Sequence, residues 1–147
     1  MEKKYRMTDE TMTIGVLSII TLHRIEAIRD FGNVKAGDKG GWIERESNLS
    51  HNGNCWVGGN AKVYDVAQVC DDARIYGDAE VHGNALVCDR AQVCDNAQVY
   101  GNAFLCINTQ VCDNALVCDN AQVCDNAKVC GDACVCGDAI IYGAARA

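Results

Sequence analysis

The sequence predicts an all-β fold in which short parallel strands coil into a solenoid. Three observations carry this prediction. Aliphatic residues recur at every sixth position over most of the chain, and a pair of turn-forming residues follows most of them. The composition also has no proline, few aromatic residues and many small ones. A compact globule usually needs larger core residues, so this composition favours a thin, regular structure.

The six-residue period is continuous from residue 57 to residue 141. An aliphatic residue, most often valine, occupies every sixth position, and a small residue, most often alanine, stands two positions before it. The repeat unit is therefore A-x-V-x-(D/G)-(N/D). Residues two apart lie on the same side of a strand, so alanine and valine are predicted to face inward. Gly, Asn and Asp suit the turns, and each rung can then pair with the rungs above and below.

In this pattern the chain resembles the hexapeptide-repeat left-handed parallel β-helix proteins over roughly residues 43–144. Fifteen consecutive units keep the phase without an insertion. The resemblance implies a triangular prism with three hexapeptides in each coil, and hence about five to six coils. We therefore expect a left-handed parallel β-helix for residues 43–147.

Residues 1–42 depart from the repeat, and we expect them to form an N-terminal β cap. The stretches YRMT, MTIGVLSIITL and HRIEAI predict short strands, with a turn at DET. The segments GGWIE and CWV, among others, resemble the leading part of bacterial and prophage hexapeptide proteins, some of which carry transferase labels. A cap would cover the exposed edge of the first coil. Trp42 and Trp56 are expected to pack in it rather than to contact a ligand.

The outward residues sort into three flat faces when the repeats are wound at eighteen residues per coil. Nine of the eleven cysteines stand at intervals that are multiples of six, directly after the inward aliphatic residue. They are predicted to form ladders along the prism. Tyrosine takes the same position in four repeats, at residues 64, 76, 100 and 142. This exchange favours cysteine as a medium-sized packing residue over cysteine as a disulfide or metal ligand.

Cys118, Cys134 and Cys136 form the one local cluster, and they are a weak candidate metal site. A tetrahedral zinc site needs four convergent ligands, whereas a straight column on a flat face offers two neighbours. Stacked disulfides would have an acceptable Cα spacing of ~4.8 Å, but side-chain directions in parallel strands oppose them. We therefore expect neither a metal nor a cofactor.

One face combines apolar outward residues, and contiguous exposed apolar side chains commonly mark an interface. Ile107, close to this face, stands where a turn Asp or Gly belongs. We expect a homo-oligomer that forms through the candidate interface residues Leu86, Cys88, Phe104, Cys106 and Ile140.

The formal charge of −7 is concentrated in the repeats, where residues 57–144 carry four basic and twelve acidic side chains. This acidity argues against direct binding to nucleic acid or to an anionic membrane. The charged start of the chain and the short apolar run IGVLSII show no secretory signal, which favours the cytoplasm and reduced thiols. The corner residues Asp71, Asp89, Asp95 and Asp113 are candidates for binding a basic partner, although turn formation is their simpler role.

The favoured function is non-enzymatic binding or assembly, in which rigid flat faces are presented and the apolar ladder self-associates. One alternative is a phage-type inhibitor, an acidic mimic or sponge that sequesters a host protein. The resemblance also implies a second alternative, a hexapeptide acyltransferase with a coenzyme A thioester and a catalytic histidine. His23, His51 and His82 stand beside no loop insertion that would build a substrate pocket, so we expect no catalytic residue.

Overall fold

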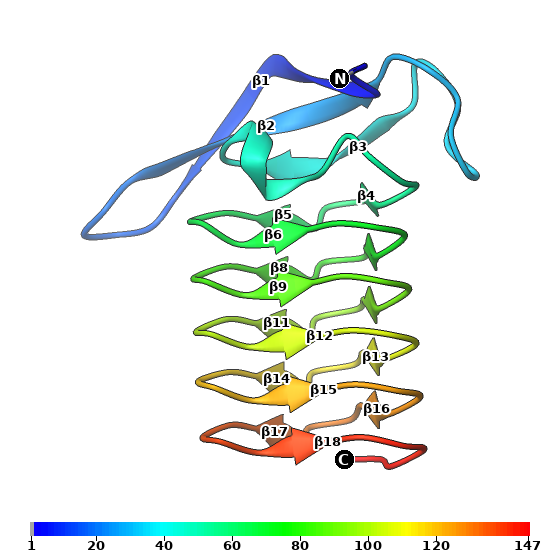
Figure 1. Cartoon of the computed structure of the whole chain (residues 1–147). Helices are drawn as coiled ribbons and strands as arrows, with labels where there is room; N and C mark the ends of the chain where they lie inside the picture. The colour runs from blue at the N-terminus through cyan, green and yellow to red at the C-terminus, as the bar shows by residue number, and fades with distance from the viewer. Residues whose placement is uncertain (1) are drawn as a thin grey trace.

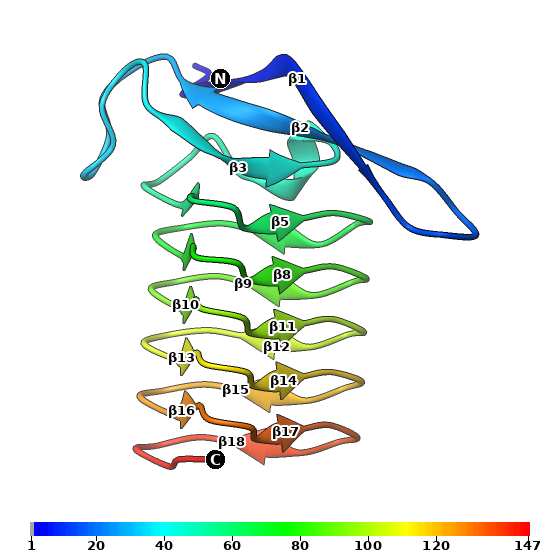
Figure 2. The same ribbon diagram turned by 180° about the vertical axis from the view of Figure 1, so that it is seen from behind.

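The computed structural model describes residues 2–147 and shows a triangular β-solenoid beneath a small β-sheet cap (Figures 1 and 2). Face 1 consists of β6 (Gln68–Val69), β9 (Leu86–Val87), β12 (Phe104–Leu105), β15 (Gln122–Val123) and β18 (Ile140–Ile141). Face 2 consists of β4 (Trp56–Val57), β7 (Arg74–Ile75), β10 (Gln92–Val93), β13 (Gln110–Val111) and β16 (Lys128–Val129). Face 3 contains β5 (Lys62–Val63), β8 (Glu80–Val81), β11 (Gln98–Val99), β14 (Leu116–Val117) and β17 (Cys134–Val135).

Each strand pairs in parallel and in register with the strand one coil later on the same face. Leu86 pairs with Phe104 on face 1, and Lys62 pairs with Glu80 on face 3. In both views the strands nearest the viewer run from left to right while the chain descends from the cap, so the coil is left-handed (Figures 1 and 2). The predicted fold class is confirmed.

The core is a column of small and aliphatic side chains along the prism axis. The inward aliphatic residues from Val57 to Val129 and the inward alanines from Ala61 to Ala127 are buried. Thr109 takes one alanine position, where its Oγ1 donates a hydrogen bond of 2.7 Å to the carbonyl of Cys106. Each buried valine contributes roughly 1.5–3 kcal/mol, and the small alanines let the three faces approach closely.

The corners of the prism require left-handed backbone. The first turn residue of every unit from Gly53 to Gly143 has a φ between +57° and +69°. Glycine adopts this conformation freely and aspartate tolerates it, which explains why the repeat uses these two residues. Ile107 is the exception among the corners, with a β-branched side chain at φ +61°.

The cap begins with an antiparallel hairpin of β1 (Tyr5–Ile14) and β2 (Ile20–Ala27) that projects beyond the prism (Figure 1). The expected turn at DET is wrong. These residues lie inside β1, where a register shift between Met7 and Thr11 absorbs them while their side chains face solvent. The chain reverses instead at residues 15–19, since Gly15 can adopt a φ of +95°.

The third cap strand, β3 (Lys39–Ile43), joins the cap to the solenoid. It pairs antiparallel with β2 and parallel with β5, so the cap sheet continues into face 3. A short 3-10 helix, η1 (Glu46–Asn48), follows it. Asn48 is fully buried there, accepting the N–H of Arg45 at 2.8 Å and donating to the carbonyl of Ala67 at 2.8 Å. This amide therefore fastens the cap to the first coil.

The two tryptophans occupy different environments in the cap. Trp42 is buried beneath the guanidinium of Arg24, which lies 4.5 Å from its ring centroid. Trp56 is half-buried and makes edge contacts with Phe31 at 5.3 Å and with Tyr5 at 6.5 Å between ring centroids. Trp42 packs inside the protein, whereas Trp56 packs on one side and keeps part of its surface open.

Candidate functional site

The corner aspartates bond to the backbone of the following coil. In each case Oδ2 accepts the N–H of the corner residue 18 positions later, at 2.9–3.1 Å; the acceptors are Asp65, Asp71, Asp89, Asp95, Asp113, Asp119 and Asp125. Such charge-assisted hydrogen bonds contribute roughly 1.5–3 kcal/mol each. The four predicted acidic corners are thus part of the scaffold, and a role in binding a basic partner remains a prediction for them.

A second ladder runs beside the aspartates at the next turn position. Asn84 donates from Nδ2 to Oδ1 of Asn102 at 3.1 Å, and Asn102 donates in the same way to Asn120 at 3.2 Å. The column ends where Asn120 Nδ2 donates to Oδ1 of Asp138 at 3.2 Å. These exposed amides therefore bond to one another along the prism and strengthen the stacking of the coils.

Face 1 brings the predicted interface residues into one continuous surface. Leu86 and Phe104 are neighbours in the parallel ladder, and Cys88 and Cys106 occupy the next outward position, two residues further along the chain. Cys106 is buried among its neighbours, whereas Ile140 is 57% exposed. The strands therefore place four of these residues side by side and Ile140 at the far end of the same face.

Three of the ladder cysteines are poor nucleophiles. Burial, reinforced by nearby aspartates, raises the pKa of Cys70 and of Cys112 to about 11 and that of Cys88 to about 12. These groups are therefore protonated thiols at neutral pH, and the thiolate is the form that attacks electrophiles and binds metals. This agrees with a packing role on the faces.

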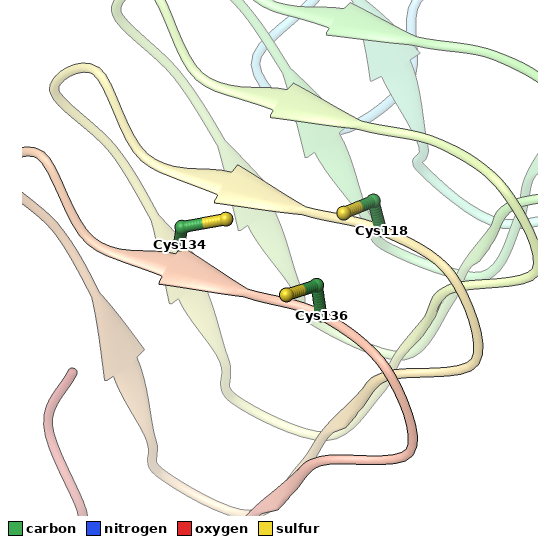
Figure 3. A group of neighbouring side chains, drawn as sticks. All are labelled: Cys118, Cys134 and Cys136. Carbon is green, nitrogen blue, oxygen red and sulfur yellow. The ribbon is translucent and has the colours of Figure 1, made fainter.

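Cys118, Cys134 and Cys136 gather on face 3, two from the β17 rung and one from the preceding coil (Figure 3). Their sulfur atoms all lie within 4.8 Å of one another; Cys118 is buried and the other two are exposed. Three sulfurs suit a soft ion with few ligands, whereas structural zinc takes four. No fourth Cys, His, Asp or Glu joins this group within residues 2–147, so the cluster stays a weak candidate metal site.

His82 forms part of an aromatic stack on face 3. Its ring lies parallel to Tyr64 at 4.7 Å and to Tyr100 at 5.1 Å between centroids. Burial lowers the pKa of His82, an effect that Asp65 and Glu80 oppose. The neutral imidazole is thus a packing member of the stack, between two coils that each supply a tyrosine.

His51 lies at the top of face 1, in a shallow hollow of about 450 Å³. Its ring stacks on Tyr5 at 4.1 Å, its Nδ1 accepts the N–H of Lys4, and its Nε2 lies 3.7 Å from Glu46 Oε2. Burial lowers the pKa of His51. The third histidine, His23, contacts the Thr8 carbonyl through Nδ1 at 3.1 Å. The imidazole–carboxylate contact at His51 was missed in the sequence because it depends on how η1 folds back on the cap.

Comparisons with known proteins support a β-solenoid with a transferase-named relative. A family described as YdcK Beta solenoid repeat matches residues 67–83 and 110–125. A 60-residue stretch is 42% identical to a protein from Escherichia coli (strain K12) named "Uncharacterized acetyltransferase YdcK". The aligned part covers 37% of this chain and 18% of that protein, so the chain spans less than a fifth of its relative. Within residues 2–147 no helix is long and apolar enough to cross a bilayer.

Proposed function

We propose that the chain is a non-enzymatic binding or assembly protein that self-associates through face 1. The observation that supports this is the charge distribution over the three faces. The outward strand residues of face 1 carry no charge, whereas face 2 carries Arg74 and Lys128 and face 3 carries Lys62 and Glu80. In a chain of formal charge −7, two copies repel each other least where they meet through an uncharged surface.

The apolar ladder gives this surface a driving force. Leu86 and Phe104 are half-buried in register, so each keeps apolar area that a second copy would remove from water. Stable interfaces bury about 800 Å² on each partner, and a flat face of five rungs can meet its own copy about a two-fold axis. Charged substitutions in the middle of such a surface would leave an unpaired charge buried between the copies.

The mass of the protein in solution tests this proposal. Light scattering on a sizing column is expected to show a defined oligomer for the wild type and a monomer for Leu86→Asp/Phe104→Asp. The matched control, Gln98→Asp/Leu116→Asp, places the same two charges at paired positions of face 3 and should keep the oligomer. Equal masses for wild type and the face 1 variant, or a monomer in both variants, would remove face 1 as the interface.

The hairpin tip supports a second candidate, binding to a host protein. The β1–β2 arm projects beyond the prism (Figure 2). Val16 is 92% exposed and Leu17 is 99% exposed in the turn between these two strands. Two such apolar side chains on a projecting arm can insert into a hollow of another protein. A Val16→Ser/Leu17→Ser variant should keep the oligomer state of the wild type and lose a partner captured from a cell extract. Capture at wild-type strength by this variant would exclude the tip.

Acyl transfer remains the enzymatic candidate, because the matched relative is named an acetyltransferase. The histidine nearest a carboxylate is His51, beside Glu46, but its Nδ1 accepts the N–H of Lys4 and its Nε2 is buried. This imidazole would have to turn before it could act as the general base that acyl transfer requires. Calorimetric titration with acetyl coenzyme A decides this point. Saturable heat with the wild type that is lost in His51→Ala would favour the enzyme over the assembly protein, and its absence would favour assembly.

A further inference from the structure

A cavity opens on face 2 directly beneath the cap. It has a volume of about 210 Å³, and its lining includes Trp56, Gly58, Arg74 and Tyr76. A second hollow of about 290 Å³ shares Asn54, Arg74 and Gln92 with it and adds Arg90. The loop of residues 28–38 lies over this part of the molecule and contributes Val34 to the first cavity and Gly32 to the second (Figure 1). The two hollows therefore form one groove between the cap and the first coils.

The groove exists because one rung of the face 2 ladder lacks a side chain. The fifteen outward positions that follow the inward aliphatic residue hold Tyr, Cys or His, except for position 58, which holds glycine. A Cβ built on Gly58 would lie 3.6 Å from Cδ1 of Trp56 and 4.0 Å from Cβ of Tyr76, which are ordinary contact distances. The backbone thus tolerates a side chain here, and the missing one leaves a slot between the two aromatic rings.

The walls of this slot are aromatic and held in place. Phe31 and Tyr5 fix the Trp56 indole through edge contacts. The hydroxyl of Tyr76 donates to Oε1 of Gln92 at 3.2 Å, and Tyr76 is 40% exposed. Rigid, partly exposed rings are suited to contact a planar group at little entropic cost.

The groove also concentrates positive charge in an acidic region. Residues 57–144 contain four basic and twelve acidic side chains, and two of the four, Arg74 and Arg90, line the groove. Neither arginine forms an ion pair with any residue between positions 2 and 147. Asp72 also lines the second hollow, and its Oδ1 accepts the N–H of Asn54 at 3.1 Å. Two unpaired guanidinium groups are well suited to a phosphate or carboxylate.

We propose that this groove binds a small ligand that joins a planar aromatic ring to an anionic group. The ring occupies the slot beside Trp56 and Tyr76 above Gly58, and the phosphate or carboxylate meets Arg74 and Arg90. This site lies on face 2, so it is independent of self-association through face 1. A mononucleotide and an aromatic carboxylate share this chemistry, and they differ in the anion that the arginines receive.

Fluorescence of Trp56 provides the test, in a Trp42→Phe background that leaves it as the single indole. The probes are adenosine monophosphate and benzoate, neither of which contains an indole. Adenosine and inorganic phosphate represent the two halves of adenosine monophosphate. We expect at least one of the two probes to quench the fluorescence saturably. Adenosine and inorganic phosphate should each bind at least tenfold more weakly than adenosine monophosphate. Arg74→Gln and Arg90→Gln should each weaken binding by about tenfold or more, because each removes a charge-assisted contact.

The blocking variant is Gly58→Tyr, which inserts the residue that the ladder uses at other rungs. It should abolish quenching while its thermal unfolding midpoint stays at or above that of the background protein. If this variant does not fold, Gly58→Cys fills the slot with the smaller ladder residue and serves instead. The proposal is overturned if neither whole probe binds, if the blocked variant binds normally, or if adenosine and its monophosphate bind equally well.

Discussion

Replacing Ile107 by asparagine should stabilise the solenoid. Ile107 holds a φ of +61° at a corner where all equivalent residues are Asp or Gly. It also interrupts the aspartate ladder, since Asp89 accepts the Ile107 N–H at 2.9 Å but isoleucine offers no acceptor to Asp125 one coil later. Asparagine tolerates left-handed backbone, and its Oδ1 can accept the Asp125 N–H without adding charge to the column.

The magnitude follows from three contributions. Relief of the left-handed backbone contributes about 1–2 kcal/mol, and the new hydrogen bond contributes about 1 kcal/mol. Isoleucine is 41% exposed, so the lost burial costs about 1–2 kcal/mol. The free energy of unfolding should therefore rise by about 1 kcal/mol.

Urea unfolding followed by circular dichroism measures this change, and hydrogen exchange of the Asp125 amide reports it locally. Ile107→Val is the matched control, because it keeps a β-branched side chain and supplies no acceptor. It should be no more stable than the wild type. An asparagine variant that matches the valine variant in midpoint and in Asp125 protection would refute the strain and the ladder argument together.

Three further outcomes are expected. Burial lowers the pKa of His82 below its usual value of about 6.5, so the unfolded chain binds the proton first, and stability should fall as the pH drops through 6.5. In His82→Tyr, the urea midpoints measured at pH 7.5 and pH 5.5 should therefore differ less than in the wild type. An unchanged difference would contradict this role of His82. Alkylation at pH 8 followed by mass spectrometry should label the exposed Cys134 and Cys136 before the buried Cys55, and the reverse order would be incompatible with the fold. Asn48→Ala removes buried bonds between cap and coil and should lower the free energy of unfolding by about 2–4 kcal/mol in urea titration, so a loss below about 0.5 kcal/mol would show that the amide does not anchor the cap.

The solenoid could be predicted from sequence because each of its rules is local. The strand period, the inward Val and Ala and the left-handed corners each depend on residues within one hexapeptide, and fifteen repetitions make the pattern unambiguous. The position of Ile107 at a strained corner follows from the same count. Assignment of Leu86 and Phe104 to neighbouring rungs needed the further assumption of eighteen residues per coil, which the register confirms.

The cap could not be predicted to the same depth, since its strands follow no period. The polar DET segment suggested a turn, yet a register shift in β1 accommodates it. The contact of His51 with Glu46 depends on long-range folding of η1. The groove at Gly58 had a sequence signal, which is the missing side chain in an otherwise complete ladder. That this gap becomes a cavity depends on the neighbouring cap loop, whose position the sequence does not predict.

The register between coils also has a consequence for how such a chain can change in length. Within the coils from β4 to β18, every corner aspartate and every strand finds its partner 18 residues away, and each coil presents nearly the same partners to the next. An in-frame duplication or loss of the DNA encoding one coil would therefore lengthen or shorten the rod by one rung and leave the cap junction intact. Most proteins lose their core when a segment of this size is removed. In this chain, a change in the number of encoded repeats would change only the number of coils.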